Sequence, residues 1–371
     1  MSPSLRFPEF TGEWEEFSLG EIGDSFIGLT YKPTDTVPSG GIIVFRSSNI
    51  QDGCIDYKDI VRVNKKVREN LITKNGDLLI CARNGSSRLI GKNALLHRTD
   101  ANQTFGAFMM VFRSDKNHFV HHLLNTKRYT SQVAENLGAR INQITSSDLS
   151  SFRFFFPKDD KEMTRIASLF DLLDGRIAVQ NRLIDRLQSL MKGIRHRIIN
   201  EAKGKIVCLC EVSDIYQPQT ISSADLTETG YPVYGANGII GHYTSYNHEA
   251  EQVCITCRGN TCGGVNYTKS KSWITGNAMV VNVDRYQNIV SKRYIYHYLS
   301  NCDFNSIISG SSQPQIVRAP LAKFKIILPT VMQQYKIAHC LDVIQNKINV
   351  NSNILNLLIR QKQYLLRKMF I

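Results

Sequence analysis

Arginine, asparagine and glutamine side chains gather in the turn regions of this 371-residue chain. Arginine can donate two parallel hydrogen bonds to a guanine, and asparagine or glutamine can pair with an adenine as donor and acceptor. These residue types suit the reading of base edges, although asparagine, serine and glycine also populate turns for conformational reasons alone. The candidate base-contacting residues are Arg46, Asn49, Arg83, Asn84, Arg88, Arg140, Asn142, Gln143, Asn237, Arg258, Asn260, Thr261, Gln313 and Gln315.

Basic residues near these turns would contact phosphates, which position a protein on nucleic acid without reading its sequence. The formal net charge is +13, and both halves of the chain are basic. This excess favours nucleic acid as a partner over a membrane, because no basic amphipathic anchor is evident; solubility alone is the alternative explanation. The candidate phosphate contacts are Lys92, Lys127, Arg128, Lys269, Lys271, Lys292 and Arg293.

The sequence contains no convincing catalytic or metal-binding constellation. Residues 85–93 resemble a phosphate-binding loop, but the spacing is one residue too long and Asn93 has no hydroxyl for magnesium. Cys254, Cys257 and Cys262 follow a C-x2-C-x4-C pattern, yet the second pair of ligands that zinc sites usually need is missing. We therefore expect buried strand thiols, no metal and no cofactor bound by this chain.

Adjacent histidines at positions 121 and 122 could in principle ligate a metal. They fall in a segment with a helical apolar pattern, where surface or half-buried histidines are more common than ligand pairs. We interpret them as ordinary helix residues. The protein is thus predicted to bind its target rather than to transform it.

Short apolar runs separated by turn residues predict a strand-rich first domain. The expected strands cover residues 41–45, 75–80, 89–91, 106–112 and 152–156, and a helix is expected over residues 118–137. The second half repeats this plan: Leu78–Arg83 matches Val253–Arg258, and Gln143 matches Gln315. The scaffold positions of the two halves agree while the loops between them differ, which suggests two domains that perform one task on two targets.

Two long helices must position these domains. Apolar residues alternate at spacings of four and three, the pattern of a coiled-coil seam, and the same pattern recurs 171 positions later. About 40 helical residues span about 60 Å. The seam residues are Ile166, Phe170, Leu173, Ile177, Ile184, Leu187, Ile337, Leu341, Ile344, Ile348, Leu355 and Leu358.

The polar interruption of the seam also repeats, as Gln180 and Asn351, which favours two helices that pack on each other in a fixed register. We predict an antiparallel coiled coil with pseudo-twofold symmetry and a domain at each end. Lys362 stands where the first seam has Met191, which predicts looser packing near the C-terminus.

The predicted fold class is α+β, with two mixed α/β target-recognition domains separated by two long antiparallel helices. The expected segments are residues 1–157 and 201–330 for the domains and 158–200 and 331–371 for the spacer helices. The sequence lacks an 18-residue apolar run and a recognisable secretion signal, and its nine cysteines are scattered. A cytoplasmic protein is expected.

The order domain, helix, domain, helix resembles the specificity subunit of type I restriction-modification systems. The resemblance covers nearly the whole chain and includes Arg6–Phe10 with Trp14, Pro232–Gly241 and Ile337–Asp342. It implies that each domain recognises half of a bipartite site in double-stranded DNA, while the helices set the gap. It also implies docking of two methylation subunits, which would bind S-adenosylmethionine and catalyse adenine-N6 methylation in host defence.

The resemblance allows a restriction subunit in the same assembly, and it makes this chain a non-catalytic subunit. The alternative is a non-catalytic coiled-coil adaptor with two protein-binding domains.

Overall fold

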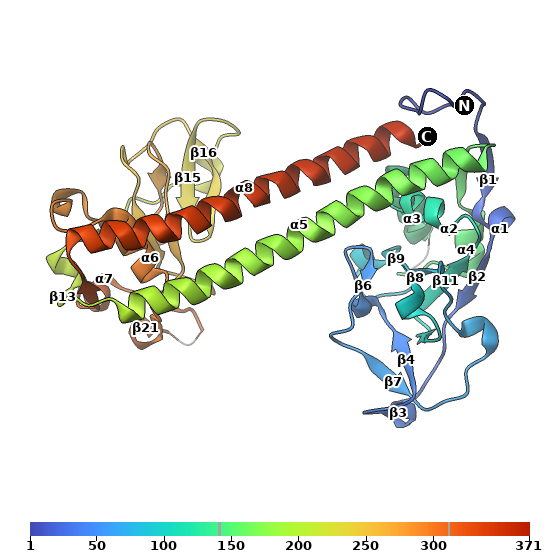
Figure 1. The fold of residues 1–371 in the computed structure, drawn as a ribbon, viewed down its shortest axis with the longest axis horizontal. Coiled ribbons are helices and arrows are strands. Elements are labelled where there is room, and N and C mark those ends of the chain that lie inside the picture. The colour runs from blue at the N-terminus through green and yellow to red at the C-terminus, as the bar shows by residue number, and fades with distance from the viewer. Residues whose placement is uncertain (140–141, 311) are drawn as a thin grey trace. The chain divides into compact units, whose positions relative to one another are not determined.

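The computed structural model describes residues 1–139, 142–310 and 312–371 (Figure 1). The chain divides into two compact units. Unit 1 comprises Met1–Val179 and Ile354–Ile371, and unit 2 comprises Gln180–Asn353. Among the described residues, no helix is both long and apolar enough to cross a membrane.

Unit 1 is built on a four-stranded antiparallel sheet. Leu78 and Ile80 of its third strand pack in a core on one side of the sheet. Leu79 and Cys81 of the same strand pack in a second core on the other side, as expected from the alternation of side chains along a strand. The strand order is β2 (Asp24–Ile27), β11 (Met109–Arg113), β8 (Leu78–Cys81) and β9 (Asn93–Leu95).

Among the residues that the structure describes, a second sheet, two strand pairs, four α-helices and several short 3-10 helices complete the domain of unit 1. The second sheet has the order β10 (Thr104–Phe105), β4 (Ile42–Phe45), β7 (Val61–Val63) and β3 (Thr36–Val37), with β10 parallel to β4. The strand pairs are β1 (Glu15–Ser18) with β12 (Arg153–Phe156) and β5 (Ile50–Gln51) with β6 (Cys54–Ile55). The helices are α1 (Leu19–Ile22), α2 (Asn117–Leu123), α3 (Lys127–Ala139) and α4 (Ser146–Ser151).

Unit 2 has a domain of the same kind. Its antiparallel sheet has the order β14 (Asp214–Tyr216), β20 (Ala278–Asn282), β17 (Val253–Thr256) and β18 (Val265–Tyr267). The second sheet has the order β16 (Gly238–Tyr243), β15 (Tyr231–Gly235) and β19 (Trp273–Ile274), with β19 parallel to β15. The remaining elements are the pairs β13 (Lys205–Cys208) with β23 (Lys325–Leu328) and β21 (Ile308–Ser309) with β22 (Gln315–Ile316), and the helices α6 (Lys292–Leu299) and α7 (Arg318–Ala322).

Equivalent strands occupy equivalent places in the two domains. The order β2-β11-β8-β9 corresponds to β14-β20-β17-β18, and the pair β1–β12 corresponds to β13–β23. A short strand pairs in parallel in both second sheets, β10 on β4 and β19 on β15. The tandem repeat and the mixed α/β class predicted from the sequence are confirmed.

The two long helices are also present, as α5 (Asp160–Glu201) and α8 (Val331–Met369). Within unit 1, the first part of α5 lies against the last part of α8. The ring centroids of Phe170 and Phe370 are 5.5 Å apart, and Lys362 Nζ lies 2.5 Å from Asp174 Oδ1. Residue numbers rise along one helix as they fall along the other, so the helices run antiparallel in this unit.

Within unit 2, the last part of α5 packs antiparallel on the first part of α8. Met191, Leu341 and Ile348 form a small core there. At the predicted polar interruption, Gln180 Nε2 donates to Asn351 Oδ1 at 2.7 Å and to the Asn351 carbonyl oxygen at 3.0 Å. The repeated polar residues thus satisfy each other, and the predicted packing of the two helices is confirmed.

Every predicted seam residue is buried or half-buried. The buried ones are Ile166, Phe170, Leu173, Ile184, Leu341 and Ile348, and the half-buried ones are Ile177, Leu187, Ile337, Ile344, Leu355 and Leu358.

The expectation of loose packing around Lys362 is wrong. Its ammonium pairs with Asp174, a seam-side carboxylate that the apolar pattern could not reveal. Beyond it, Leu366, Met369 and Phe370 are buried in the core of unit 1. The C-terminal end of α8 is therefore firmly packed in that unit.

Two local predictions are also wrong. The single helix expected over residues 118–137 is divided into α2 and α3, because Thr126 Oγ1 donates to the Leu123 carbonyl and Asn125 Nδ2 to the His121 carbonyl at the end of α2. The strand expected at residues 89–91 begins only at Asn93. Gly91 has a φ of +83°, a left-handed conformation that interrupts an extended strand.

Candidate nucleic-acid interface

The end of β8 places one group of predicted residues together in unit 1. The Ala82 and Arg83 amides donate to the Phe108 carbonyl at 3.0 and 2.9 Å, and the Ile144 amide donates to the Ala82 carbonyl at 2.8 Å. Arg83 and Gln143 form an isolated antiparallel β-bridge. Backbone contacts far apart in the sequence therefore bring these two candidate side chains side by side.

Neighbouring loops gather around this bridge. Asn84 Nδ2 donates to Ser47 Oγ at 3.1 Å, and Asn142 Nδ2 reaches the Gly85 carbonyl at 3.4 Å. Asn142 adopts a φ of +52°, which asparagine tolerates better than most residues. We call this set the first loop face; its members are Arg46, Arg83, Asn84, Asn142 and Gln143.

The end of β17 builds the same arrangement in unit 2. The Ile316 amide donates to the Cys257 carbonyl at 3.0 Å, and Arg258 and Gln315 form an isolated antiparallel β-bridge. This bridge matches the Arg83–Gln143 bridge of unit 1. Gly259 follows Arg258 with a φ of +85°, and its amide donates to the Pro314 carbonyl at 3.0 Å.

Further candidate residues lie on the loops around this second bridge. Thr256 Oγ1 donates to the Ala236 carbonyl, which places the Asn237 turn beside the end of β17. Arg258, Asn260, Thr261, Gln313 and Gln315 are all exposed. We call the set Asn237, Arg258, Asn260, Thr261 and Gln315 the second loop face.

Two candidate base contacts are constrained by their surroundings. Asn49 is fully buried, and its amide nitrogen donates to the Asp56 and Asp59 carbonyls at 3.0 and 2.9 Å. Its side chain holds a turn and is not available at the surface, so the prediction of a base contact for Asn49 is wrong. Arg46 pairs with Asp59 at 2.8 Å and would have to release that carboxylate to reach a ligand.

Arg88 is exposed in a short turn of helix after β8, which is compatible with the prediction made for it. Arg140 lies outside the described residues.

Three predicted phosphate contacts, Lys292, Arg293 and Arg128, are paired with other groups of the protein. Lys292 donates to Asp284 at 2.5 Å and to the Glu251 carbonyl at 2.6 Å. Arg293 pairs with Asp342 of α8 and lies 4.3 Å from the centroid of the Tyr267 ring.

Arg128 donates to Glu16 at 2.5 Å and to the Arg153 carbonyl at 2.8 Å, and lies over the Phe155 ring. These three cations take part in packing, and pairings that cross a loop or join distant segments leave no signal in the local sequence. Lys127, Lys269 and Lys271 are exposed, and Lys92 is half-buried.

A matched histidine–aspartate link joins each domain to a long helix, and sequence reasoning missed it. His122 Nε2 lies 2.9 Å from Asp171 Oδ1 in unit 1, and His297 Nε2 lies 2.8 Å from Asp342 Oδ1 in unit 2. Both imidazoles are fully buried. A carboxylate can only accept, so Nε2 carries the proton in both links. The available signal was that the two aspartates are 171 positions apart, the same offset as the seam.

In unit 2, burial and hydrogen bonds set the charge states of the linked His297 and Asp342. Burial lowers the pKa of His297 to about 4, although the Asp342 carboxylate acts to raise it. Burial acts to raise the pKa of Asp342, but hydrogen bonds from Arg293 and His297 outweigh this effect and lower it. A neutral imidazole and an ionised carboxylate therefore fix α6 to α8.

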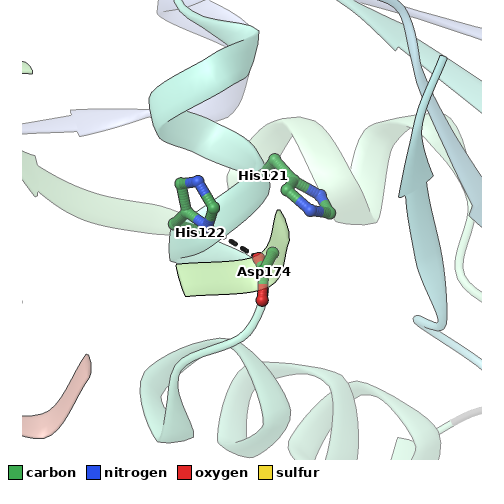
Figure 2. Close-up of side chains that lie close together, drawn as sticks. All are labelled: His121, His122 and Asp174. Carbon is green, nitrogen blue, oxygen red and sulfur yellow. Dashed lines mark ion pairs between the residues drawn. The ribbon is translucent and has the colours of Figure 1, made fainter. Parts of the chain in front are cut away.

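One side-chain cluster has the spacing of a cation site (Figure 2). A ring nitrogen of His121, one of His122 and a carboxylate oxygen of Asp174 lie within 4.8 Å of one another. Lys362 already supplies a cation to Asp174, and His121 Nδ1 contacts Asn93 Oδ1 at 3.1 Å. We interpret the cluster as polar packing between α2 and the long helices. The expectation of surface or half-buried histidines is wrong, since both are buried.

The cysteines of the C-x2-C-x4-C run do not converge. Cys254 packs in one core of unit 2, whereas Cys257 and Cys262 contact another. Burial raises the pKa of the Cys254 thiol to about 12, which suits a packed thiol rather than a thiolate ligand.

Two domains with the same strand order, each with a different set of polar loop residues and each packed on parts of the two long helices, define a tandem-repeat protein. The chain belongs to the family described as the type I restriction modification DNA specificity domain, which matches residues 11–189 and 202–360.

Individual relatives are specificity subunits. The chain is 31% identical over 148 residues to the type I restriction enzyme EcoprrI specificity subunit of Escherichia coli, covering 38% of this chain and 36% of that protein. It is 27% identical over 188 residues to the EcoKI specificity subunit of Escherichia coli strain K12, covering 48% of this chain and 40% of that protein. The matched regions thus span less than half the length of these curated relatives.

Solved structures share the fold along the whole chain. The crystal structure of a type I restriction-modification S subunit from M. genitalium aligns with a TM-score of 0.71 at 17% identity, covering 100% of this chain and 99% of that one. A chain from a study of complex assembly and conformational transition of the type I restriction-modification system aligns with a TM-score of 0.54 at 18% identity, covering 97% and 98%. At these identities the likeness establishes the fold alone.

Proposed function

We propose that this chain is the DNA sequence-specificity subunit of a type I restriction-modification complex, in which each domain recognises one half of a bipartite site. The observation that carries this proposal is the matched pair of bridges, Arg83–Gln143 and Arg258–Gln315, at the same place in two repeated frames. Each bridge presents an arginine and a glutamine, which suit guanine and adenine edges in the major groove. The loops around them differ, as two different half-sites would require.

In this proposal exposed lysines of the two domains contact the phosphates of the DNA backbone. Lys127, Lys269 and Lys271 are exposed, and the net charge of +13 supplies a favourable long-range field for DNA. Lys292, Arg293 and Arg128 are omitted from the proposed phosphate contacts because their partners lie within the protein.

The long helices have the two roles of setting the gap and docking the methylation subunits. Their seam fixes the length of the connection between the domains. Away from the seam they expose large apolar residues at a heptad interval, such as Val343 and Val350 of α8, which are 56% and 57% exposed. Leu183 and Leu190 of α5 follow the same interval. Exposed apolar stripes of this kind are suited to helices of a partner.

Catalysis is assigned to the partners. In this scheme two methylation subunits bind S-adenosylmethionine and methylate adenine at N6, and restriction subunits can join the same complex. This chain contributes recognition and spacing within the cytoplasm.

Methylation maps of cells that make the complete complex test the proposal. Arg83→Ala and Gln143→Ala should relax one half-site, by about 1 to 3 kcal/mol for each bidentate pair of hydrogen bonds that is removed, and Arg258→Ala and Gln315→Ala should relax only the other. Exposed Arg98, which belongs to neither loop face, provides the control substitution Arg98→Ala.

If these variants weakened DNA binding equally on all sequences, the bridges would be assigned to phosphate or scaffold contacts instead. A coiled-coil adaptor with two protein-binding domains would show no sequence-dependent DNA affinity at all. A specificity subunit in its complex should prefer its site over other DNA by roughly three or more orders of magnitude at physiological salt.

A further inference from the structure

A large aromatic side chain is exposed beside the first loop face. The Met109 amide donates to the Gly106 carbonyl at 2.8 Å, closing a tight turn before β11. Phe108, at the third position of this turn, is 60% exposed, whereas both neighbouring strands are buried. An exposed ring at this place contributes little to the core, so its presence calls for another explanation.

Phe108 is tied directly to the arginine of the bridge. Its carbonyl accepts from both the Ala82 and Arg83 amides. The Arg83 guanidinium carbon lies 5.5 Å from the centre of the Phe108 ring, within the range of a cation–π contact. Phe108 also borders a surface pocket of about 670 Å³ that is lined by Arg46 and Ser47. The ring therefore belongs to the same surface as the candidate base contacts.

Unit 2 has the same turn with a different residue at its third position. The Ala278 amide donates to the Thr275 carbonyl at 3.0 Å, and the carbonyl of Asn277 accepts from the Cys257 amide at 3.0 Å. The turn follows β19 as its counterpart follows β10, and Asn277 is exposed next to Arg258. Position by position, Asn277 is the equivalent of Phe108.

We propose that this turn position determines specificity in both domains, as a third side chain beside the arginine and glutamine of each bridge. The inference rests on the proposed function. Phe108 offers no hydrogen bond, so it contacts the C5 methyl group of a thymine and discriminates against cytosine, which lacks that methyl. Asn277 pairs with the N6 and N7 atoms of an adenine in the other half-site.

The test is a map of methylated adenines in cells that make the complete complex with Phe108→Ala, Phe108→Leu or Asn277→Ala. Phe108→Ala should admit cytosine at one thymine position of a single half-site, with the preference falling about tenfold. Phe108→Leu keeps an apolar contact and should retain that preference. Asn277→Ala should reduce the preference for adenine at one position of the other half-site by about tenfold or more.

The methylation maps distinguish a failure of this inference from a failure of the proposed function. A sequence-specific wild-type map that is unchanged in both alanine variants would overturn this inference and leave the proposed function standing. Equal weakening on every sequence would also overturn it, because that result assigns the turn to packing or phosphate contact. A wild-type complex without any sequence preference would overturn the proposed function itself, and this inference with it. Thermal unfolding of each purified complex verifies that the variants are folded.

Discussion

A matched deletion in the two long helices tests whether they set the gap between half-sites. We would remove residues 181–187 from α5 together with residues 344–350 from α8. In unit 2 these segments face each other in the antiparallel pair, and both lie next to the bonded residues Gln180 and Asn351. Seven residues correspond to two turns of the seam, so the apolar face stays in phase and Gln180 again meets Asn351.

The expected size of the effect follows from helix geometry. Seven residues remove about 10 Å of helix from the connection. This length corresponds to about three base pairs if the helices lie along the duplex, at about 3.4 Å per step. The shortened complex should therefore methylate the same two half-sites with about three fewer base pairs between them.

The assay is a genome-wide map of methylated adenines in a host that supplies the methylation partner. Deleting residues 181–187 alone is the control, because it displaces one seam against the other and should abolish methylation through misfolding. Circular dichroism of the matched deletion should retain its helical signal. A folded, active complex that still required the original gap would refute the role of the helices as a ruler.

Three further outcomes follow from buried polar contacts. Glu162→Gln should lower the free energy of unfolding of unit 1, measured by urea titration, by about 3 kcal/mol or more, because it leaves the Arg6 guanidinium without its buried carboxylate. The control Glu15→Gln removes an exposed carboxylate and should cost less than about 1 kcal/mol. Replacing Gln180 and Asn351 together by leucine should raise the melting temperature but permit other registers, seen as a mixture of gap lengths in the methylation map. The pKa of His297 is about 4 in the folded protein, whereas a histidine in the unfolded chain has a pKa near 6.5. The stability of unit 2 should therefore fall by roughly 3 kcal/mol as the pH drops from 6.5 to 4. A His297→Phe variant that kept this loss would contradict the assignment.

Periodic features were predictable from the sequence, whereas pairings between distant residues were not. The seam from Ile166 to Leu358 follows from spacing alone, because a coiled coil repeats the same contact along its length. The match between Gln180 and Asn351 likewise follows from the repeat, and the structure places them in contact. By contrast, the division between α2 and α3 depends on side-chain bonds from Asn125 and Thr126, which a helical apolar pattern does not reveal.

Charge was the least reliable guide to the candidate site. Arg293 and Lys292 look like surface cations in the sequence, yet their acidic partners are far away in the chain or across a loop. Asn49 has a side chain that could bind a base edge, but it is fully buried within its turn. The sequence did not predict the pairing of Arg83 with Gln143, because a bridge between residues 60 positions apart leaves no local signal. The repeat indicated only that each residue has a counterpart, Arg258 and Gln315.

The manner in which the loop faces are attached has an evolutionary consequence. The bridges at Arg83 and Arg258 are made by main-chain groups, which every amino acid other than proline supplies. Exposed side chains at these positions carry little of the folding free energy, so most exchanges there should be nearly neutral for stability. A lineage can therefore alter what each face contacts by single substitutions, while every intermediate along the way remains a folded protein.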